Sequence, residues 1–451
     1  MTLIPHQDAA LSEPAQSLPS EKALSESLRV EVAQLLVADA QDREEKGERP
    51  RSARQRRALG ERLLTETLER HTARLLTRGE KALEKEAERR VMSAAHGALF
   101  GLGGLQQLLD DAEVENIDAN GCDGVFVRYA DGRKEQVAPI ASSDGELVEL
   151  IRTVAARGGE EERRFDRAVP RLNVQLPDGS RMFAVMAVSG RVSLSIRRHR
   201  YPRATLAQLR DLGAFDEDLE QLLRALVRAR KNIIVAGGTN VGKTTLLRAL
   251  ASEIPASERL VTIEDTFELG LHQDSLHPDV VPMQAREANI EGEGAIDQAE
   301  LVRWGLRMAP DRVIVGEIRG AEVVPMCNAM SQGNDGSLST IHASTSRGVF
   351  TKLAAYAVQA PERLSLEATN LLVASAVHFV IHLARDTSGR RAVSSIREII
   401  DADGGQLISN EVYRPGPDRR AVPAVPLRAA TLDDLAAVGY RAPQTASGWS
   451  L

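Results

Sequence analysis

The clearest chemical pattern in the chain is the spacing Gly-x-x-x-x-Gly-Lys-Thr, which extends from Gly237 to Thr244. An apolar run that ends at Val235 precedes it, and a helical pattern rich in leucine follows it. In such a strand–loop–helix setting the glycines let successive backbone N–H groups point at phosphate oxygens, and the start of the helix adds a partial positive charge. The pattern therefore predicts a nucleotide-binding loop.

Single residues of this loop have separate expected roles. Lys243 is expected to reach the β- and γ-phosphates of ATP, and the Thr244 hydroxyl is expected to bind Mg²⁺. An ordinary glycine-rich turn is disfavoured, because the spacing, the lysine, the threonine and the flanking elements all agree. The predicted nucleotide contacts in the loop are Gly237, Gly238, Thr239, Asn240, Val241, Gly242, Lys243, Thr244 and Thr245.

Polar residues follow three apolar runs farther along the chain. The first run ends in Glu264, Asp265 and Glu268, the second in Glu317 and the third in His342. The carboxyl ends of parallel strands face the ligand crevice, so we expect one of the first three acids to orient the attacking water. Glu317 is expected to bind Mg²⁺ through water. His342 could be an ordinary core or surface histidine, but its position beside the other strand ends favours a phosphate sensor.

The elements that must position these residues follow from the surrounding pattern. From residue 231 to about 345, short apolar strands alternate with helices, which predicts a parallel sheet covered on both faces. After about residue 378 the pattern changes to strand-like runs, which predict an antiparallel extension of that sheet. We therefore predict an α/β ATPase domain over 231–414.

The rest of the chain divides into segments of different character. A helical arm or bundle is expected before a mixed α+β domain, although a mobile charged arm is an alternative for the helical part. The expected segments are a disordered tail (1–20), the helical arm (21–100), the α+β domain (101–200), a linker with an entry helix (201–230) and a second tail (415–451).

Composition excludes several classes of protein. The chain has 451 residues, a formal net charge of −7 and two cysteines, Cys122 and Cys327. Two cysteines are too few for a disulfide framework or a four-cysteine zinc site. The acidic balance counts against a general nucleic-acid binder. Because the sequence has no long apolar stretch and no signal-peptide pattern at its start, we expect a cytoplasmic protein.

The order of four motifs resembles one known family. GGTNVGKTT, TIEDTFEL, LRMAPDRVIVGEIRG and GSLSTIHAST occur in the order found in the traffic ATPases of type II/IV secretion and pilus assembly, the GspE-like proteins. The resemblance covers about residues 104 to 400 and is nearest to the CpaF-like branch that drives tight-adherence (Tad or Flp) pili. It implies an α+β N-terminal domain linked to a RecA-like ATPase domain, assembled as a hexameric ring.

The resemblance also assigns roles to residues. The family's acidic box matches 264–268, which places its catalytic glutamate at Glu268 and puts Glu264 and Asp265 near the metal. Its Walker B glutamate matches Glu317, and its histidine box ends at His342. Pilus-type members commonly have a second histidine at the start of that box. Asn334 stands there in this chain, so a mechanism with two histidines is left open.

Arginines ahead of the loop are the last group of candidates. Family members bring arginines from the N-terminal domain to the phosphates, and the best positional matches are Arg164, Arg181 and Arg197. A guanidinium can clamp a phosphoryl group through two hydrogen bonds, although each of these arginines could instead solvate a hairpin face. Three further arginines lie in matching segments, and one of them is expected to serve a neighbouring subunit: Arg286, Arg307 and Arg319.

The leading functional hypothesis is an ATP-driven motor at the inner face of the cell membrane. Its expected partners are further copies of itself and inner-membrane platform proteins of a secretion or pilus system. The alternatives are a RecA-like nucleic-acid motor, which the acidic balance and scarce aromatics disfavour, and a nucleotide-sensing scaffold. The presence of Lys243, Glu268 and Glu317 together favours turnover. The missing four-cysteine insert points away from type II secretion ATPases and toward the CpaF-like or conjugation-type branch.

Overall fold

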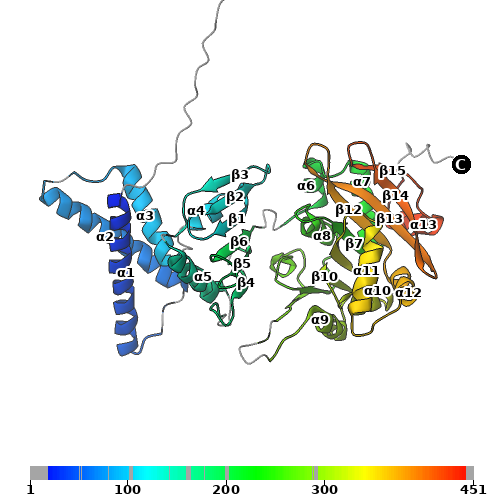
Figure 1. Ribbon diagram of the computed structural model, residues 1–451, viewed down its shortest axis with the longest axis horizontal. Helices are drawn as coiled ribbons and strands as arrows, with labels where there is room; N and C mark the ends of the chain where they lie inside the picture. Colours follow the sequence, from blue (N-terminus) through cyan, green and yellow to red (C-terminus); the bar gives the residue numbers. More distant parts are fainter. Residues whose placement is uncertain are drawn as a thin grey trace, which may run out of the picture. The chain divides into compact units, whose positions relative to one another are not determined.

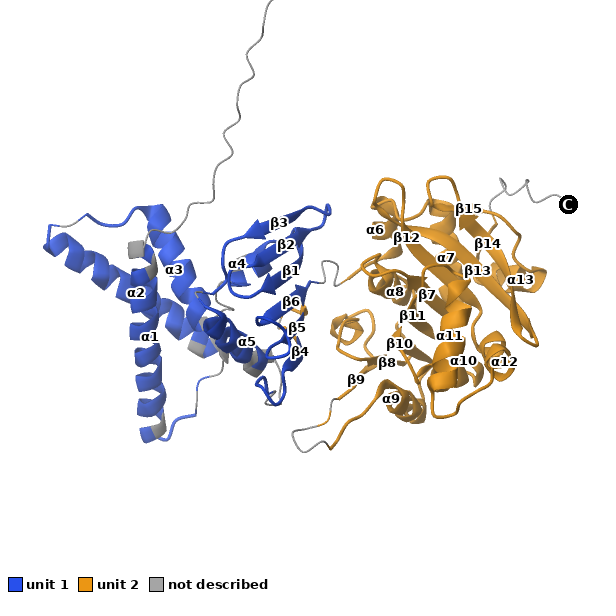
Figure 2. Ribbon diagram, viewed as in Figure 1, with its two compact units in different colours: residues 1–174, 182–198 blue, residues 175–181, 199–451 orange. Residues whose placement is uncertain are grey.

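The computed structural model describes residues 19–49, 51, 53–79, 81–100, 105–141, 143–158, 164–176, 178–198, 203–286, 288 and 293–442. The chain forms two compact units, coloured separately in Figure 2. Unit 1 contains residues 1–174 and 182–198, and unit 2 contains residues 175–181 and 199–451. Most of the tail expected over 1–20 lies outside the described residues, and a helix begins at Pro19.

Unit 1 begins with three helices, α1 (Pro19–Glu45), α2 (Ala53–Thr77) and α3 (Lys85–Phe100). They share an apolar core because each helix repeats its apolar side chains near the helical period. The ion pair between Arg90 and Glu21 joins α3 to α1, with 2.7 Å between Nη2 and Oε1. The three helices pack on one another around Leu28, Val32, Leu36, Leu64, Leu68, Val91 and Ala95.

The second part of unit 1 is built around a six-stranded sheet in the order β3-β2-β1-β6-β5-β4, in which residues 175–181, from the last residue of β4 to the first of β5, belong to unit 2. The central strand β1 pairs antiparallel with both β2 and β6. This agrees with the strands and turns expected for an α+β domain. Its elements are α4 (Leu105–Asp110), β1 (Val114–Asn120), β2 (Val125–Tyr129), β3 (Lys134–Val137), α5 (Asp144–Gly158), β4 (Arg171–Gln175), β5 (Arg181–Val185) and β6 (Ser193–Arg197).

Unit 2 is built on a nine-stranded sheet in the order β15-β14-β13-β12-β7-β11-β10-β8-β9. The strands from β12 to β9 in this order are parallel, and β13, β14 and β15 extend the sheet in antiparallel pairs. The strands are β7 (Ile233–Gly237), β8 (Leu260–Glu264), β9 (Val280–Gln284), β10 (Arg312–Ile318), β11 (Leu338–His342), β12 (Phe379–Arg385), β13 (Arg391–Asp403), β14 (Gln406–Pro415) and β15 (Ala421–Pro423).

Helices cover both faces of the parallel part of this sheet (Figure 1). Alternate residues of β7 enter different cores, because successive side chains of a strand point to opposite faces. Ile233 and Val235 pack with α6 (Leu206–Asp211), α7 (Glu217–Arg228) and α8 (Lys243–Ala251). Ile234 and Ala236 pack on the other face with a second group of helices, α9 (Gln298–Gly305), α10 (Val323–Ser331), α11 (Gly348–Gln359) and α12 (Leu366–Ala376).

Two short helical turns complete unit 2, η1 (Leu271–Gln273) and η2 (Leu306–Met308). Together the two units give an α/β RecA-like P-loop domain preceded by an α+β domain and a helical arm. This confirms the fold class predicted from the sequence.

The segment after residue 414 corrects in part the prediction of a tail over 415–451. It contains β15 and the helix α13 (Ala429–Ala437). Leu435 is fully buried in the core that also holds α7 and α8. Thr431 donates a hydrogen bond to the buried carboxylate of Glu398 on β13. Leu435 and Thr431 thus attach this segment to unit 2, although its Pro and Arg content resembles a tail.

Asn232 fixes the amino ends of the central strands. Its side chain is fully buried; Oδ1 accepts hydrogen bonds from the backbone N–H groups of Gly336 and Ser337, and Nδ2 donates to the carbonyls of Met330 and Ala376. Gly336 and Ser337 directly precede β11, Ala376 lies at the end of α12 shortly before β12, and Met330 lies in α10. Because β7, β11 and β12 run parallel, aligning their amino ends also aligns their carboxyl ends, where Gly237 lies opposite His342 and Leu383.

Candidate nucleotide site

The loop from Gly237 to Thr244 joins β7 to α8, and its glycines are required by its shape. A Cβ on Gly237 would lie 2.6 Å from Cγ2 of Val241 and 2.7 Å from the carbonyl oxygen of Leu383. Gly242 has a φ of 96° and is the N-cap of α8. The left-handed region suits glycine, which has no Cβ. The loop therefore forms a closely wound cradle at the start of a helix, a geometry that suits phosphate binding.

Lys243 folds back over this cradle. Its Nζ donates a hydrogen bond of 2.9 Å to the carbonyl of Gly238 and lies 3.2 Å from Nδ1 of His342. The lysine is only 8% exposed, so its charge acts in a poorly solvated place. Thr244 follows it in the first turn of α8 and is half-buried. This loop therefore brings together the Lys243 ammonium, the Thr244 hydroxyl and the start of α8. These groups suit a nucleoside triphosphate bound with Mg²⁺.

Glu317 lies at the centre of a charged cluster formed by the ends of β10 and β11. Its Oε1 is 2.7 Å from Nε2 of His342, and its Oε2 accepts a 2.6 Å hydrogen bond from Nε of Arg319. Burial favours the neutral acid, but the hydrogen bond from His342 and the charge of Arg319 outweigh it and lower the pKa of Glu317 to about 2. Glu317 is therefore an ionised carboxylate, linked through His342 to Lys243.

Asp265 and Glu268 follow β8 and pair with arginines. Asp265 accepts a 2.9 Å hydrogen bond from Arg319, and Glu268 accepts a 2.7 Å bond from Arg181. Arg181 also lies 3.4 Å from Asp265, and residues 175–181 belong to the same compact unit as the loop. Arg319 thus contacts both Asp265 and Glu317. The contacts form one charged network that extends from Lys243 through the strand ends to Asp265 and Glu268.

Glu264 has a different environment from the other acids. It is 3% exposed, and its Oε2 accepts hydrogen bonds from the backbone N–H groups of Glu268 (2.6 Å) and Leu269 (2.8 Å). Burial raises the pKa of Glu264 to about 7, although these two backbone bonds act in the opposite direction. A carboxylate tied in this way holds the segment that carries Glu268. Glu264 therefore has the geometry of a positioning residue.

Replacing Glu264 tests this assignment. One oxygen accepts both backbone hydrogen bonds, so Glu264→Gln keeps them, and we expect ATP turnover at pH 8 within about threefold of wild type. Glu264→Ala removes both bonds, and we expect it to lower turnover by about tenfold or more because Glu268 loses its support. Phosphate-release assays on both variants measure the difference. A Gln variant as inactive as the Ala variant would make Glu264 itself the base.

The pKa of Glu264 also predicts a pH dependence of stability. Because the folded pKa is about 7, above the ordinary 4.5, the stabilisation from this group is complete below pH 4.5 and is lost as the pH rises to 7. The loss is about 3 kcal/mol at most. Glu264→Gln should therefore gain stability relative to wild type between pH 5 and 8. Denaturant unfolding at several pH values measures this, and parallel curves would contradict it.

Arg391 and Arg385 were not predicted as site residues. Nε of Arg391 donates to the carbonyl of Asn240 at 3.2 Å, and its Nη2 donates to Oδ1 of the same residue at 3.1 Å. Arg385 donates to that carbonyl at 3.4 Å. Both arginines flank the turn between β12 and β13, and they add positive charge beside the loop. No local sequence pattern could have predicted this contact, because Arg391 and Asn240 are 151 residues apart in the sequence.

Two predicted arginines lie outside this network. Arg164 and Arg197 both belong to unit 1. Arg164 pairs with Asp166 at 2.7 Å, and Arg197 is exposed at the end of β6. Of the three arginines predicted ahead of the loop, Arg181 alone contacts acidic residues of the candidate site among the residues that the structure describes.

The remaining predicted arginines and Asn334 lie at different places in unit 2, and only one of them joins the charged network. Arg286 donates to the carbonyl of Gly294 outside the charged cluster, and Arg307 lies in η2, whereas Arg319 joins Glu317. Asn334 precedes β11 and donates a 2.6 Å hydrogen bond to the carbonyl of Pro310. His342 ends the same strand. Asn334 therefore lies at the opposite end of β11 from His342 and has a structural contact there.

The family model for the type II/IV secretion system protein matches residues 99–415. This range includes the loop, the three strand ends and the six-stranded sheet. The chain belongs to the type II/IV secretion system protein family. No helix among the described residues of this family member is long and apolar enough to cross a membrane.

Relatives within this family are substantially similar over most of their length. The chain is 35% identical over 316 residues to a Mycobacterium tuberculosis protein named for conjugal transfer. The aligned region covers 68% of this chain and 86% of that protein. It is 30% identical over 322 residues to the type IV secretion system protein VirB11 of Brucella suis. That aligned region covers 64% of this chain and 87% of that protein.

One solved structure of a VirB11 ATPase is similar to this chain. The VirB11 ATPase of the Brucella suis type IV secretion system, crystallised with sulphate, is 28% identical to this chain. The match covers 69% of this chain and 96% of that chain, with a TM-score of 0.35. The helices before residue 99 lie outside the range matched by the family model.

Proposed function

We propose that the chain hydrolyses ATP and thereby drives a type II/IV secretion or pilus-assembly machine. The observation that carries the proposal is the network at the carboxyl edge of the parallel sheet. It links Lys243, His342 and Glu317, and Arg319 extends it to the acids after β8. A loop built only to bind a nucleotide needs no such set of ionised groups beside it.

The residues have separate proposed roles in turnover. Lys243 and the N–H groups of the loop bind and orient the phosphates. Glu268 accepts a proton from the attacking water, and Glu264 holds the backbone of Glu268 in place. Bound Mg²⁺ would neutralise phosphate charge, and Thr244, Glu317 and Asp265 are the residues proposed to hold it, directly or through water.

We propose that nucleotide binding is linked to conformation by arginines that exchange carboxylate partners for phosphate. Arg181 and Arg319 are paired with carboxylates, and a phosphate group offers a guanidinium the same charge-assisted, bidentate hydrogen bonds. Phosphate binding would therefore draw these arginines from Glu268 and Glu317 and free Glu268 to act as a base. Arg164 and Arg197 are retained as candidates that would reach the phosphates in another conformational state.

The wider assignment rests on the family. We propose a hexameric ring associated with the inner face of the cell membrane, with inner-membrane platform proteins as partners. Within the family we propose the CpaF-like branch of Tad pilus assembly, because the motif order resembles that branch most; the two cysteines also argue against the four-cysteine insert of type II secretion ATPases. The conjugation-type branch is the alternative, supported by the similarity to a protein named for conjugal transfer.

Stimulation of ATP turnover tests this function against a nucleic-acid motor. The full chain is assayed for phosphate release alone, with vesicles that contain inner-membrane platform proteins of a secretion or pilus system, and with single- or double-stranded DNA. We expect platform vesicles to stimulate turnover and DNA to leave it unchanged. Strong stimulation by DNA without binding to the platform proteins would contradict the proposal. Light scattering with ATP and Mg²⁺ tests the hexamer, which a persistent monomer would exclude.

A further inference from the structure

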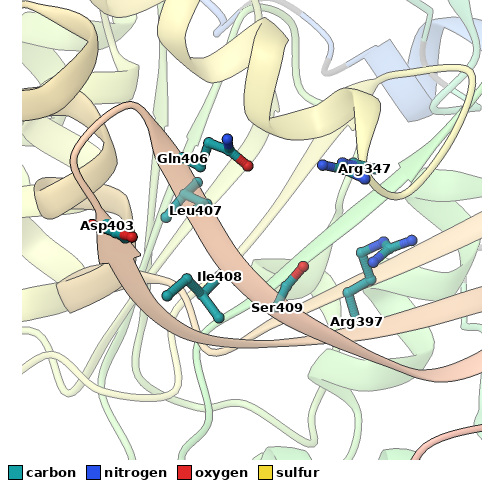
Figure 3. Close-up of a pocket in the computed structure, with 7 residues that line it drawn as sticks. All are labelled: Arg347, Arg397, Asp403, Gln406, Leu407, Ile408 and Ser409. Atoms are coloured by element: carbon teal, nitrogen blue, oxygen red, sulfur yellow. The ribbon is translucent and has the colours of Figure 1, made fainter.

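A polar cavity lies in unit 2 and shares no lining residue with the nucleotide loop. Its volume is about 340 Å³. It is formed by the N-cap residue of α11 and by the hairpin of β13 and β14 (Figure 3). Its lining residues are Arg347, Arg397, Asp403, Gln406, Leu407, Ile408 and Ser409.

The cavity has positive charge at one side. Arg347 and Arg397 lie on the same side in Figure 3, and Asp403 lies on the other. Arg397 is held in place, because its Nε donates to Oγ of the buried Ser346 at 2.9 Å and its Nη2 pairs with Glu411 at 3.0 Å. Burial lowers the pKa of Arg397; the charge of Glu411 raises it, and that of Arg347 lowers it again.

Arg347 supplies the charge that is not neutralised. Within the described part of the chain no carboxylate forms an ion pair with it, whereas Arg397 already has Glu411. Arg347 is also the N-cap residue of a 12-residue helix, whose first turn adds a partial positive charge on the same side. An oxyanion between the two guanidiniums would relieve their mutual repulsion and accept charge-assisted hydrogen bonds.

The other side of the cavity limits the kind of ligand. Asp403 offers a carboxylate acceptor there, and the Gln406 amide and Ser409 hydroxyl lie along β14 between the two ends. Inorganic phosphate alone would leave much of the space empty, since about 300 Å³ is the lower end of the range for small-molecule sites. A ligand that fills it needs an oxyanion at one end and hydrogen-bond donors at the other.

We propose that this cavity binds a small phosphate ester of a polyol, with its phosphate between Arg347 and Arg397 and its hydroxyl groups donating to Asp403. The site is separate from the nucleotide loop and goes beyond ATP turnover. Arg347 follows closely after His342, which contacts Lys243 of that loop, because only residues 343–346 separate the two residues.

Calorimetric titration of the full chain tests the site. ADP and Mg²⁺ are kept in excess so that the nucleotide loop is occupied, and the probes are ribose 5-phosphate, inorganic phosphate and ribose. We expect ribose 5-phosphate to bind with a dissociation constant of about 1 mM or lower, inorganic phosphate to bind more weakly, and ribose not to bind. No binding of either phosphate probe would overturn the proposal.

Variants locate the bound probe. Arg347→Gln should weaken binding of ribose 5-phosphate by about tenfold, since it removes a charged donor. Arg414→Gln is the matched control, because Arg414 is an exposed arginine on β14 that does not line the cavity. Asp403→Asn should reduce the preference for ribose 5-phosphate over inorganic phosphate. Equal affinities for wild type, Arg347→Gln and Arg414→Gln would overturn the site, and an unchanged preference in Asp403→Asn would overturn the assigned orientation.

Discussion

Glu268→Gln is expected to abolish ATP turnover while nucleotide binding is retained. The substitution keeps the size of the side chain and an oxygen that can accept the 2.7 Å hydrogen bond from Arg181, but it removes the proton acceptor. Loss of a positioned general base lowers a rate by about 10²- to 10⁴-fold. Steady-state phosphate release measures the loss, and the affinity for a fluorescent ATP analogue should change by less than about threefold.

The matched control for this variant is Glu362→Gln. Glu362 is also a partly exposed glutamate paired with an arginine, Arg303 at 2.9 Å, but it lies between α11 and α12. We expect its turnover to equal that of wild type. If Glu268→Gln keeps its turnover and Glu264→Gln loses it, the roles assigned to these two acids are reversed.

Lys243→Ala is expected to remove nucleotide binding itself. The ammonium is 8% exposed and bonded to the loop carbonyl of Gly238, so it is already placed at the phosphate cradle. Charge-assisted hydrogen bonds contribute about 1.5–3 kcal/mol each, and a lysine that reaches two phosphates should account for about 100-fold in affinity. Equilibrium titration of ADP and of an ATP analogue measures this loss.

Lys352→Ala provides the comparison for Lys243→Ala. Lys352 is an exposed lysine on α11 whose Nζ lies 5.7 Å from the ring centroid of Tyr356. Its loss should leave nucleotide affinity unchanged, and the melting temperatures of both variants show whether the fold is intact. A folded Lys243→Ala protein that binds ATP as tightly as wild type would exclude the loop as the nucleotide site.

The sequence was most informative where the chemistry is local. The apolar strand, the loop and the helix of the nucleotide site are contiguous, so their residue types were enough to predict the β7–loop–α8 unit. The strand ends were also predictable, because alternating strands and helices imply a parallel sheet whose carboxyl ends meet at one edge. The contacts of His342 with Lys243 and Glu317 agree with that expectation.

Burial and long-range contacts could not be predicted in the same way. Glu264 and Glu268 both follow one apolar run, and only the fold distinguishes a buried carboxylate from one that is paired with Arg181. The contact of Arg391 with Asn240 depends on the register of β12 against β7, which no local pattern specifies. The same holds for α13, whose place depends on the core that Leu435 enters.

The central claim is that the loop and the strand-end acids form a hydrolytic site. Phosphate release by the purified full chain, with ATP and with or without Mg²⁺, tests it most directly. We predict steady turnover with Mg²⁺, its loss when EDTA removes the metal, and its absence in Glu268→Gln. A wild-type chain that binds ATP and Mg²⁺ but releases no phosphate, alone or with its membrane partners, would contradict the account.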